Sequence, residues 1–214
     1  MRPFWLIALI IISAAVAGCQ RSAVDSEFPL YAIWLDGRHH CEGIAVTPYL
    51  IATVKHCVFN QYAKVPVVPE RLSLVDVKNR SNTITAVYVN SNRYESLADL
   101  QGNDIAVLLS SIPLQGVVSV GKSNAGMITK IVLRRDGKAT KKDTPMVSLD
   151  DGTIFTSAIT CIGDSGSPLL NQQNQVVGLA SWRTEPDCNS GLSVFTRLDQ
   201  YQTWIQQLKI DHDG

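Results

Sequence analysis

The chain has 214 residues, of which 45% are hydrophobic, and it contains 19 Lys and Arg against 19 Asp and Glu. This length is enough for one sizeable core or two small ones, and the composition excludes disorder of the whole chain. Because the formal charges cancel, no net field draws the protein onto nucleic acid or onto an anionic membrane surface. Any partner must therefore be recognised by a local site.

Residues 1–18 have the order of an export signal. The cation Arg2 precedes an apolar run over residues 4–12, which is followed by small residues at 13–18. The alternative is a permanent transmembrane helix, but such a helix needs about 20 apolar residues, and the strongly apolar block here is much shorter. We therefore predict a signal peptide over residues 1–18.

Residues 16–19 read Val-Ala-Gly-Cys and resemble the lipobox of bacterial lipoproteins, in which the cysteine is lipidated after the preceding peptide is removed. One acyl chain holds a protein only marginally at a membrane, whereas the several chains of a lipoprotein hold it stably. The resemblance implies a lipid anchor on Cys19, a polar tether over residues 19–27 and attachment to the bacterial cell envelope. In a Gram-negative cell, Gln20 favours the outer membrane, with the periplasm as the alternative.

Four cysteines are left once Cys19 is set aside. An even set in an exported protein is typical of two disulfides, because the compartment is oxidising. The alternative is that some of these cysteines are free buried thiols. Four cysteines also permit three pairings, so the pattern alone does not choose a pairing of Cys41, Cys57, Cys161 and Cys188.

Beyond the tether, short runs rich in Val, Ile, Leu, Thr and aromatic residues alternate with Gly, Pro, Asn, Asp and Ser. Many short strands at such spacing are typical of sandwiches and barrels. The basic and polar stretch over residues 134–143 is typical of a solvated loop. The predicted strands cover residues 30–35, 43–46, 50–53, 72–77, 84–89, 105–109, 117–120, 128–133, 168–170, 176–182 and 192–196.

Only the end of the chain is typical of a helix. Its apolar residues recur at helical spacing, and Asp199 lies near the predicted start. The resulting stripe should pack against the strands, and it consists of Leu198, Tyr201, Trp204, Ile205 and Leu208.

Three separated segments, at residues 51–57, 102–109 and 161–170, carry His56, Asp104 and Ser165. A serine hydroxyl is a weak nucleophile and needs an adjacent base, which a histidine supplies near neutral pH. A buried carboxylate then fixes the tautomer of the imidazole and stabilises its cation. Glycines beside the serine allow backbone N–H groups to point at the oxyanion that develops on a substrate carbonyl. The three segments therefore predict nucleophilic catalysis.

Each of these residues also has a simpler interpretation. Taken singly, a histidine such as His56 is more often a buried residue whose hydrogen bonds are satisfied, and an aspartate such as Asp104 is more often a turn residue. Together with the Gly-Asp-Ser-Gly segment, the two residues favour a catalytic site. A zinc site is another alternative, because histidine and cysteine are zinc ligands. We expect no metal and no cofactor, because no zinc-finger spacing is present among His39, His40, Cys41, His56 and Cys57.

The three segments resemble the His, Asp and Ser blocks of the trypsin-like (chymotrypsin-fold) serine proteases, in that family's order. The resemblance covers residues 28–214 and implies an all-β fold of two packed six-stranded antiparallel β-barrels with a C-terminal α-helix. It implies His56 as general base, Asp104 as the residue that orients it and Ser165 as nucleophile. The N–H groups of Gly163 and Ser165 would form the oxyanion hole. The expected reaction is hydrolysis of protein peptide bonds through an acyl-enzyme.

The resemblance also implies the disulfides Cys41–Cys57 and Cys161–Cys188, the second bracing the specificity pocket. Ser181 would donate a hydrogen bond to Asp104. The implied substrate-binding residues are Ile159, Thr160, Ser181, Trp182, Arg183 and Ser193.

Three of these pocket residues depart from the trypsin pattern. Ile159 replaces the Asp of trypsins, which argues against Lys or Arg in the substrate pocket. Arg183 and Ser193 stand where two glycines usually keep the pocket walls open. Arg183 would either pair with an acidic substrate side chain or close the pocket by its bulk. The hypothesis is a preference for acidic or small residues.

The largest departure concerns Asp164. In the family, the amine of a new N-terminus is buried against this aspartate, and a lipidated Cys19 could not enter the core in that way. His39 is the first candidate for an alternative partner. The rival to a protease is therefore an inactive or latent protease-fold lipoprotein that acts as a binding module, and a third hypothesis is an esterase that uses the same triad.

Overall fold

The computed structural model describes residues 28–90 and 102–213. The predicted signal peptide, the tether and Cys19 lie outside the described residues. Over the described ranges the chain is mainly β-strand, and no helix there has the length and apolar character needed to cross a membrane.

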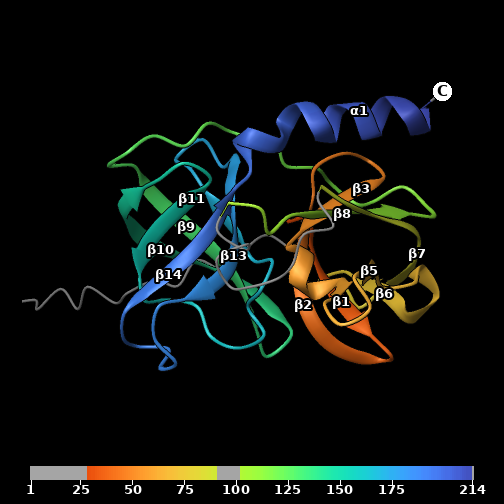
Figure 1. Cartoon of the computed structure of the whole chain (residues 1–214), viewed down its shortest axis with the longest axis horizontal. Helices are drawn as coiled ribbons and strands as arrows, with labels where there is room; N and C mark the ends of the chain where they lie inside the picture. Colours follow the sequence, from red (N-terminus) through yellow and green to blue (C-terminus); the bar gives the residue numbers. More distant parts are fainter. Residues whose placement is uncertain (1–27, 91–101, 214) are drawn as a thin grey trace, which may run out of the picture.

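Two closed antiparallel barrels of six strands each lie side by side (Figure 1), as the family resemblance implied. The strand order is β1-β2-β3-β8-β7-β6 in the first barrel and β10-β11-β14-β13-β12-β9 in the second. The first barrel contains β1 (Leu30–Leu35), β2 (Arg38–Ala45), β3 (Leu50–Thr53), β6 (Leu72–Val75), β7 (Ser81–Val89) and β8 (Ala106–Ser110). The second contains β9 (Ile128–Arg135), β10 (Lys138–Leu149), β11 (Thr153–Ser157), β12 (Pro168–Leu170), β13 (Val176–Arg183) and β14 (Leu192–Arg197).

Shorter elements complete the architecture. A two-stranded hairpin, β4 (Phe59–Asn60) with β5 (Val65–Pro66), extends from the first barrel, and the helix α1 (Gln202–Asp213) ends the chain. Single 3-10 turns occupy Lys55–Cys57, Pro69–Arg71 and Asp199–Tyr201.

Two apolar clusters fill the barrels: a larger one combines the first barrel with second-barrel residues such as Val132 and Leu179, and a smaller one lies in the second barrel. Helix α1 joins the larger cluster although it follows the second barrel in sequence. Figure 1 shows α1 lying across the first barrel. Tyr201, Ile205 and Leu208 of the predicted stripe are buried in the same cluster as Ile44 and Leu108 of the first barrel. This packing ties the end of the chain to the other half of the molecule.

An Asp-Gly turn closes one hairpin in each barrel. Asp36 and Gly37 between β1 and β2 have φ of 50° and 75°, and Asp136 and Gly137 between β9 and β10 have φ of 51° and 75°. Positive φ at both central residues is the geometry of a two-residue hairpin turn, which Asp-Gly favours. The second turn places Arg135 opposite Lys138 at the hairpin end.

Two of the sequence-based element predictions were wrong. Residues 134–143 are not a loop but belong to the β9–β10 hairpin, and residues 117–120 contribute only an isolated bridge from Val120 to Val176. Strand β10 keeps few apolar residues on its inner side, and its outer side carries Lys and Asp, so its alternation is weak in the sequence.

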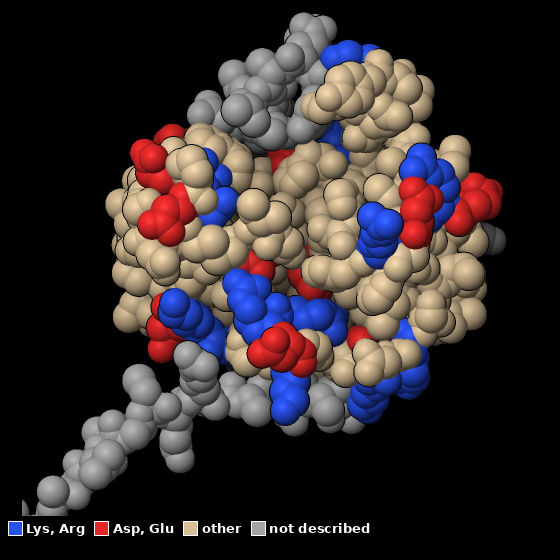
Figure 2. Space-filling model, turned by 90° about the horizontal axis from the view of Figure 1, so that it is seen from below, with Lys and Arg blue, Asp and Glu red and all other residues tan. Residues whose placement is uncertain are grey.

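Charged side chains of both signs are interspersed over the face shown in Figure 2, with Lys and Arg gathered near its middle beside Asp and Glu. This distribution agrees with the neutral composition. Recognition of a charged partner must therefore depend on a local group of charges and not on the net charge of the molecule.

Candidate active site

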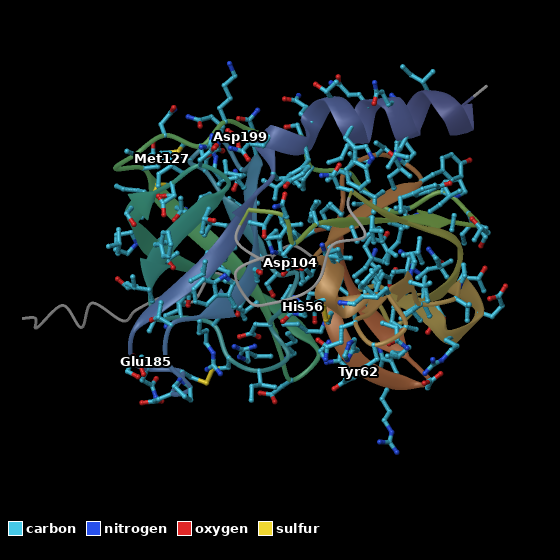
Figure 3. All side chains as sticks on the ribbon, in the orientation of Figure 1. His56, Tyr62, Asp104, Met127, Glu185 and Asp199 are labelled. Carbon is cyan, nitrogen blue, oxygen red and sulfur yellow. A yellow bond between two sulfur atoms is a disulfide. The ribbon has the colours of Figure 1, made fainter. Side chains whose placement is uncertain are left out.

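The predicted site lies in a cleft of about 660 Å³ between the barrels. His40 and His56 of the first barrel line it on one side, and Ser165, Trp182 and Arg183 of the second line it on the other. Figure 3 shows His56 and Asp104 between the two barrels.

His56, Asp104 and Ser165 are joined by consecutive hydrogen bonds. Asp104 Oδ2 is 2.7 Å from His56 Nδ1, and His56 Nε2 is 2.9 Å from Ser165 Oγ. The backbone N–H of His56 donates to Asp104 Oδ1 at 2.9 Å, and the hydroxyl of Ser181 donates to Asp104 Oδ2, as the resemblance implied. With both carboxylate oxygens engaged, the imidazole is held with Nε2 facing the serine.

Burial and charge set the protonation of this pair. Asp104 is fully buried. Burial by itself opposes protonation of His56, but the charge of Asp104 and its hydrogen bond outweigh that effect, so the pKa of His56 is raised above its ordinary 6.5. Burial likewise opposes ionisation of Asp104, yet the interactions with His56 and Ser181 hold the pKa of Asp104 below its ordinary value. The carboxylate is therefore charged when the imidazole accepts a proton.

The turn before Asp104 is held from the second half of the molecule. The hydroxyl of Tyr201, just before α1, donates a hydrogen bond to the carbonyl of Gly102. A Cβ built on Gly152 would lie 2.6 Å from the Cα of Gly102, so the two loops meet through glycine backbones. Burial is the main reason that the pKa of Tyr201 is raised to about 12, and this hydroxyl therefore stays a donor at neutral pH. Sequence analysis missed Tyr201 because it assigned that residue only to packing.

The loop that carries Ser165 requires its two flanking glycines. Gly163 has φ of +92° and Gly166 has φ of +84°, a left-handed conformation that glycine adopts at low cost. A Cβ on Gly166 would lie 1.8 Å from the carbonyl oxygen of Glu42. The backbone N–H of Glu42 donates to the carbonyl of Ser165 at 2.7 Å. Strand β2 therefore holds the backbone of Ser165 through a direct hydrogen bond.

The N–H groups of Gly163 and Ser165 donate to no acceptor within the described residues, whereas the neighbouring Asp164 N–H donates to the carbonyl of Cys161 at 3.1 Å. These are the two groups that the sequence assigns to an oxyanion hole. Both residues also line the cleft.

The expectation that His39 is the partner of Asp164 was wrong. Both carboxylate oxygens of Asp164 accept hydrogen bonds from the guanidinium of Arg135, and the Cys161 N–H donates to Oδ2 at 2.6 Å. His39 Nε2 instead lies 3.0 Å from Oε1 of Glu42. The reason is the β9–β10 hairpin, which the sequence did not predict and which brings Arg135 to the nucleophile loop.

Glu42 is a second buried acid that sequence analysis left without a role. Its side chain is 1% exposed and accepts hydrogen bonds from Nε of Arg134, at 3.1 and 3.2 Å. A buried carboxylate needs such a partner, because desolvation of an unpaired charge costs several kcal/mol. The signal in the sequence was a glutamate directly after Cys41, in a segment that is otherwise apolar.

Ser193 lies behind Thr160, one of the residues that line the cleft. The Ser193 hydroxyl accepts hydrogen bonds from the N–H groups of Ile159 and Thr160, both at 3.0 Å, and lies 2.9 Å from Thr160 Oγ1. Ile159 packs in the apolar cluster of the second barrel and does not line the cleft. Ser193 is fully buried and does not line the cleft either. The other predicted pocket residues, Thr160, Ser181, Trp182 and Arg183, do line the cleft.

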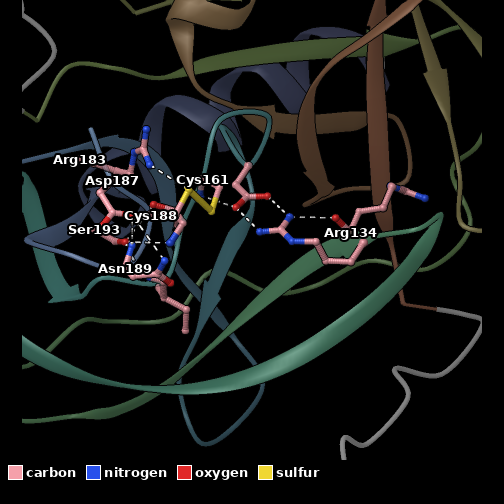
Figure 4. The surroundings of a disulfide bond; sticks show 11 residues. Arg134, Cys161, Arg183, Asp187, Cys188, Asn189 and Ser193 are labelled. Carbon is pink, nitrogen blue, oxygen red and sulfur yellow. Dashed lines mark hydrogen bonds and ion pairs between the residues drawn. A yellow bond between two sulfur atoms is a disulfide. The ribbon is translucent and has the colours of Figure 1, made fainter. Parts of the chain in front are cut away.

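Arg183 is the cation nearest to this pocket. Its guanidinium lies 3.2 Å from Sγ of Cys188, and it forms none of the ion pairs found in residues 28–90 and 102–213. Figure 4 shows Arg183 and Ser193 on one side of the Cys161–Cys188 disulfide in that view, and Arg134 on the other.

Both implied disulfides are confirmed. Cys41 is bonded to Cys57, and Cys161 to Cys188. The first bridge joins β2 to the 3-10 turn of His56, and the second joins the nucleophile loop to the segment that follows β13. Although Cys41, His56 and Cys57 cluster closely, the two sulfurs are consumed in a disulfide and are not the thiolates that zinc requires.

A two-barrel fold with a Ser-His-Asp arrangement in its cleft is similar to that of the trypsin-like serine proteases. The solved structure of human heparin binding protein superimposes with a TM-score of 0.73 at 18% identity, over 90% of this chain and 96% of that one, which shows the same fold. Residues 122–205 match the family model described as Trypsin.

Individual relatives agree with this assignment. The chain is 25% identical to brachyurin of Leptuca pugilator over 225 residues, covering 86% of this chain and 94% of that protein. It is 26% identical to a chymotrypsin-like serine proteinase of Haliotis rufescens over 204 residues, 78% of this chain and 80% of that one. A stretch of 50 residues is 42% identical to alpha-fibrinogenase of Macrovipera lebetinus, but covers 23% of this chain and 19% of that protein.

Together these matches support the trypsin-like serine protease family for this chain. The relatives named here are eukaryotic, and the bacterial lipoprotein signal stays a prediction.

Proposed function

We propose that this protein is a serine endopeptidase that hydrolyses protein peptide bonds by nucleophilic catalysis. The observation that carries the proposal is the hydrogen-bonded series from Asp104 through His56 to Ser165, open to a cleft between the barrels. This arrangement makes an otherwise weak alcohol nucleophilic, because the proton of the hydroxyl has an acceptor 2.9 Å away.

The geometry supports the following sequence of steps. Ser165 Oγ attacks the scissile carbonyl while its proton passes to His56 Nε2, and Asp104 stabilises the imidazolium. The developing oxyanion is stabilised by the N–H groups of Gly163 and Ser165. His56 then donates the proton to the leaving amine, which departs and leaves an acyl-enzyme. Water, deprotonated by His56, hydrolyses this ester and restores Ser165.

A fluorophosphonate probe tests the proposal on the purified chain. The chain is expected to be labelled on one serine, and Ser165→Ala is expected to remove the label without changing the thermal unfolding temperature. Hydrolysis of a casein digest, compared with that of a matched ester, then separates a peptidase from an esterase. Labelling that persists in Ser165→Ala would rule out Ser165 as the nucleophile.

The rival function, an inactive protease-fold binding module, rested on the lack of a cation for Asp164. Arg135 supplies that cation, and both carboxylate oxygens are engaged. This ion pair therefore favours the enzyme over the binding module.

The pocket supports a preference for small or acidic substrate residues. Thr160 lines it with the buried hydroxyl of Ser193 behind it, and the half-buried Arg183 lines its wall. A short side chain fits such a pocket, and a carboxylate would gain a charge-assisted hydrogen bond from the guanidinium. Cleavage of a peptide library tests this preference, and dominant cleavage after Lys or Arg would contradict it.

We also propose that the protein is anchored at the cell envelope through lipid on Cys19. The order of residues 1–19 supports the proposal, because a short apolar block ends in Val-Ala-Gly-Cys. In a bacterial host, radiolabelled palmitate is expected to enter the wild-type protein but not Cys19→Ser, and the variant is expected to leave the membrane fraction. Equal membrane association of both proteins would contradict the anchor.

A further inference from the structure

Asp164 occupies a position from which it controls the shape of the catalytic loop. It lies between Gly163 and Ser165, whose N–H groups are the two donors of the proposed oxyanion hole. The residue is 2% exposed. Its own backbone closes the loop on both sides, since its N–H donates to the carbonyl of Cys161 and its carbonyl accepts from the N–H of Ser167 at 2.9 Å. The position of the Asp164 carboxylate therefore sets the positions of the N–H groups of Gly163 and Ser165.

A buried carboxylate has to be compensated, and here the compensation comes from one side chain and one backbone group. Nη1 and Nη2 of Arg135 each donate to a different oxygen of Asp164, and the N–H of Cys161 donates to Oδ2 at 2.6 Å. A two-pronged guanidinium–carboxylate pair fixes orientation as well as distance. The side chain of Arg135 is 44% exposed and that of Asp164 is 3% exposed, so Arg135 reaches in from the surface.

Arg135 is itself held in place by the β9–β10 hairpin and by its neighbour. Its Nη1 also donates to the carbonyl of Arg134 at 3.0 Å. Arg134 in turn pairs with Glu42, and its Nη2 donates to the carbonyl of Leu30 at 3.2 Å. Because the N–H of Glu42 donates to the carbonyl of Ser165, the two consecutive arginines of β9 support the serine loop by two routes, Arg135 through Asp164 and Arg134 through Glu42 of the first barrel.

We propose that Arg135 is a positioning residue that keeps the Cys161–Ser165 loop in its working conformation, so that the enzyme needs no newly cleaved N-terminus to become active. This inference rests on the proposed function. Among residues 28–90 and 102–213, the groups that hold Asp164 are the guanidinium of Arg135 and the N–H of Cys161, both from the second barrel half. An N-terminal extension or a lipid anchor before residue 28 is therefore compatible with activity.

The first experiment compares Arg135→Gln with Lys138→Gln. Lys138 lies opposite Arg135 at the same hairpin end and is exposed, so its variant removes the same charge without touching Asp164. Arg135→Gln is expected to lower kcat by about 10²-fold, the cost of impairing oxyanion stabilisation, with less than threefold change in KM. Arg135→Lys is expected to recover about tenfold of this loss, because an ammonium restores charge but not the two-pronged geometry.

A second experiment needs no variant of the site and so covers the case in which Arg135→Gln does not fold. A domain that no protease in the assay removes is fused before residue 28 of the chain, and active sites are titrated with the fluorophosphonate probe. The fused protein is expected to match the unfused chain within about twofold in kcat, since no free N-terminus takes part. Loss of activity on fusion would overturn the inference.

The outcomes separate the two proposals. An active wild-type chain with Arg135→Gln as active as Lys138→Gln overturns the role of Arg135 and leaves the peptidase intact. A wild-type chain that is folded but neither labelled nor active overturns the proposed function and this inference together. A selective fall of kcat in Arg135→Gln, partial recovery in Arg135→Lys and full activity of the fused chain support both.

Discussion

At the scale of single residues, the chemistry depends on how a few buried groups share protons and hydrogen bonds. Asp104 is charged although it is fully buried, because His56 and Ser181 satisfy its oxygens. Its charge raises the pKa of His56 against the effect of burial. Since His56 has to be neutral to accept the serine proton, activity is expected to be lost as pH falls through this raised pKa.

Asp104→Asn tests this electrostatic role. Removing the carboxylate charge leaves burial as the main influence, so the pKa of His56 should fall and the acidic limb of the kcat/KM profile should move to lower pH. The rate should fall by about 10⁴-fold, because the amide favours the wrong tautomer. The measurement is kcat/KM against pH for both proteins, and an acidic limb that does not move would contradict the role.

Ser193→Gly tests whether Ser193 limits the substrate pocket. The variant removes a hydroxyl that accepts from the N–H groups of Ile159 and Thr160, which opens space behind Thr160 but leaves those donors unpaired. We expect peptide-library cleavage to shift toward larger residues, and the free energy of unfolding to drop by about 1–3 kcal/mol. Ser190→Gly, at an exposed position of the neighbouring loop, is the control. An unchanged cleavage profile would show that Ser193 does not set the pocket depth.

At the scale of elements, hairpins and the C-terminal helix bring distant residues to the cleft. The β9–β10 hairpin brings Arg134 and Arg135 to two different acids, and the 3-10 turn before α1 brings Tyr201 to the turn before Asp104. Neither contribution is visible as a motif. Strand periodicity did predict most strands of the barrels, but it missed β10, whose buried residues are few, and β11.

Tyr201→Phe tests the link between α1 and the triad. The variant leaves the buried carbonyl of Gly102 without its donor, which is expected to cost about 1–3 kcal/mol in the free energy of unfolding. The turn that carries Asp104 should loosen, so kcat should fall several-fold with little change in KM. Denaturant unfolding and steady-state kinetics measure the two effects. Tyr62→Phe, whose side chain is 89% exposed, should change neither, and an equally stable and active Tyr201→Phe would refute the link.

At the scale of the whole molecule, two barrels are joined around one cleft, and the larger apolar cluster contains residues of both. Each contributes part of the triad, with His56 and Asp104 from the first and Ser165 from the second. The two disulfides each close a loop within one barrel, spanning 16 and 27 residues. They stabilise the halves, whereas α1 and the arginine pairs connect them.

Removing each disulfide by a double Cys→Ser substitution is expected to cost about 3 kcal/mol in the free energy of unfolding. For a chain of this size, that corresponds to a fall of about 6–12 °C in Tm. Loss of the Cys161–Cys188 bridge should also slow probe labelling of Ser165, because Cys161 begins the nucleophile loop, whereas loss of Cys41–Cys57 should act on the His56 turn. Reductant should lower the Tm of the wild type but not of the chain lacking both bridges, and an unchanged wild-type Tm would contradict the stabilising role.

The sequence by itself predicted the chemistry, because the candidate reacting groups lie in short segments whose residue types such a reaction requires: a base, a carboxylate, and an alcohol flanked by glycines. Family resemblance also predicted the two-barrel fold and the pairing of the cysteines. Only the tertiary structure decided which cation holds Asp164, how Glu42 is compensated and how the buried Ser193 is hydrogen-bonded. These depend on contacts between residues 29 or more positions apart, whose geometry follows from strand register and hairpin position and leaves no local pattern in the chain.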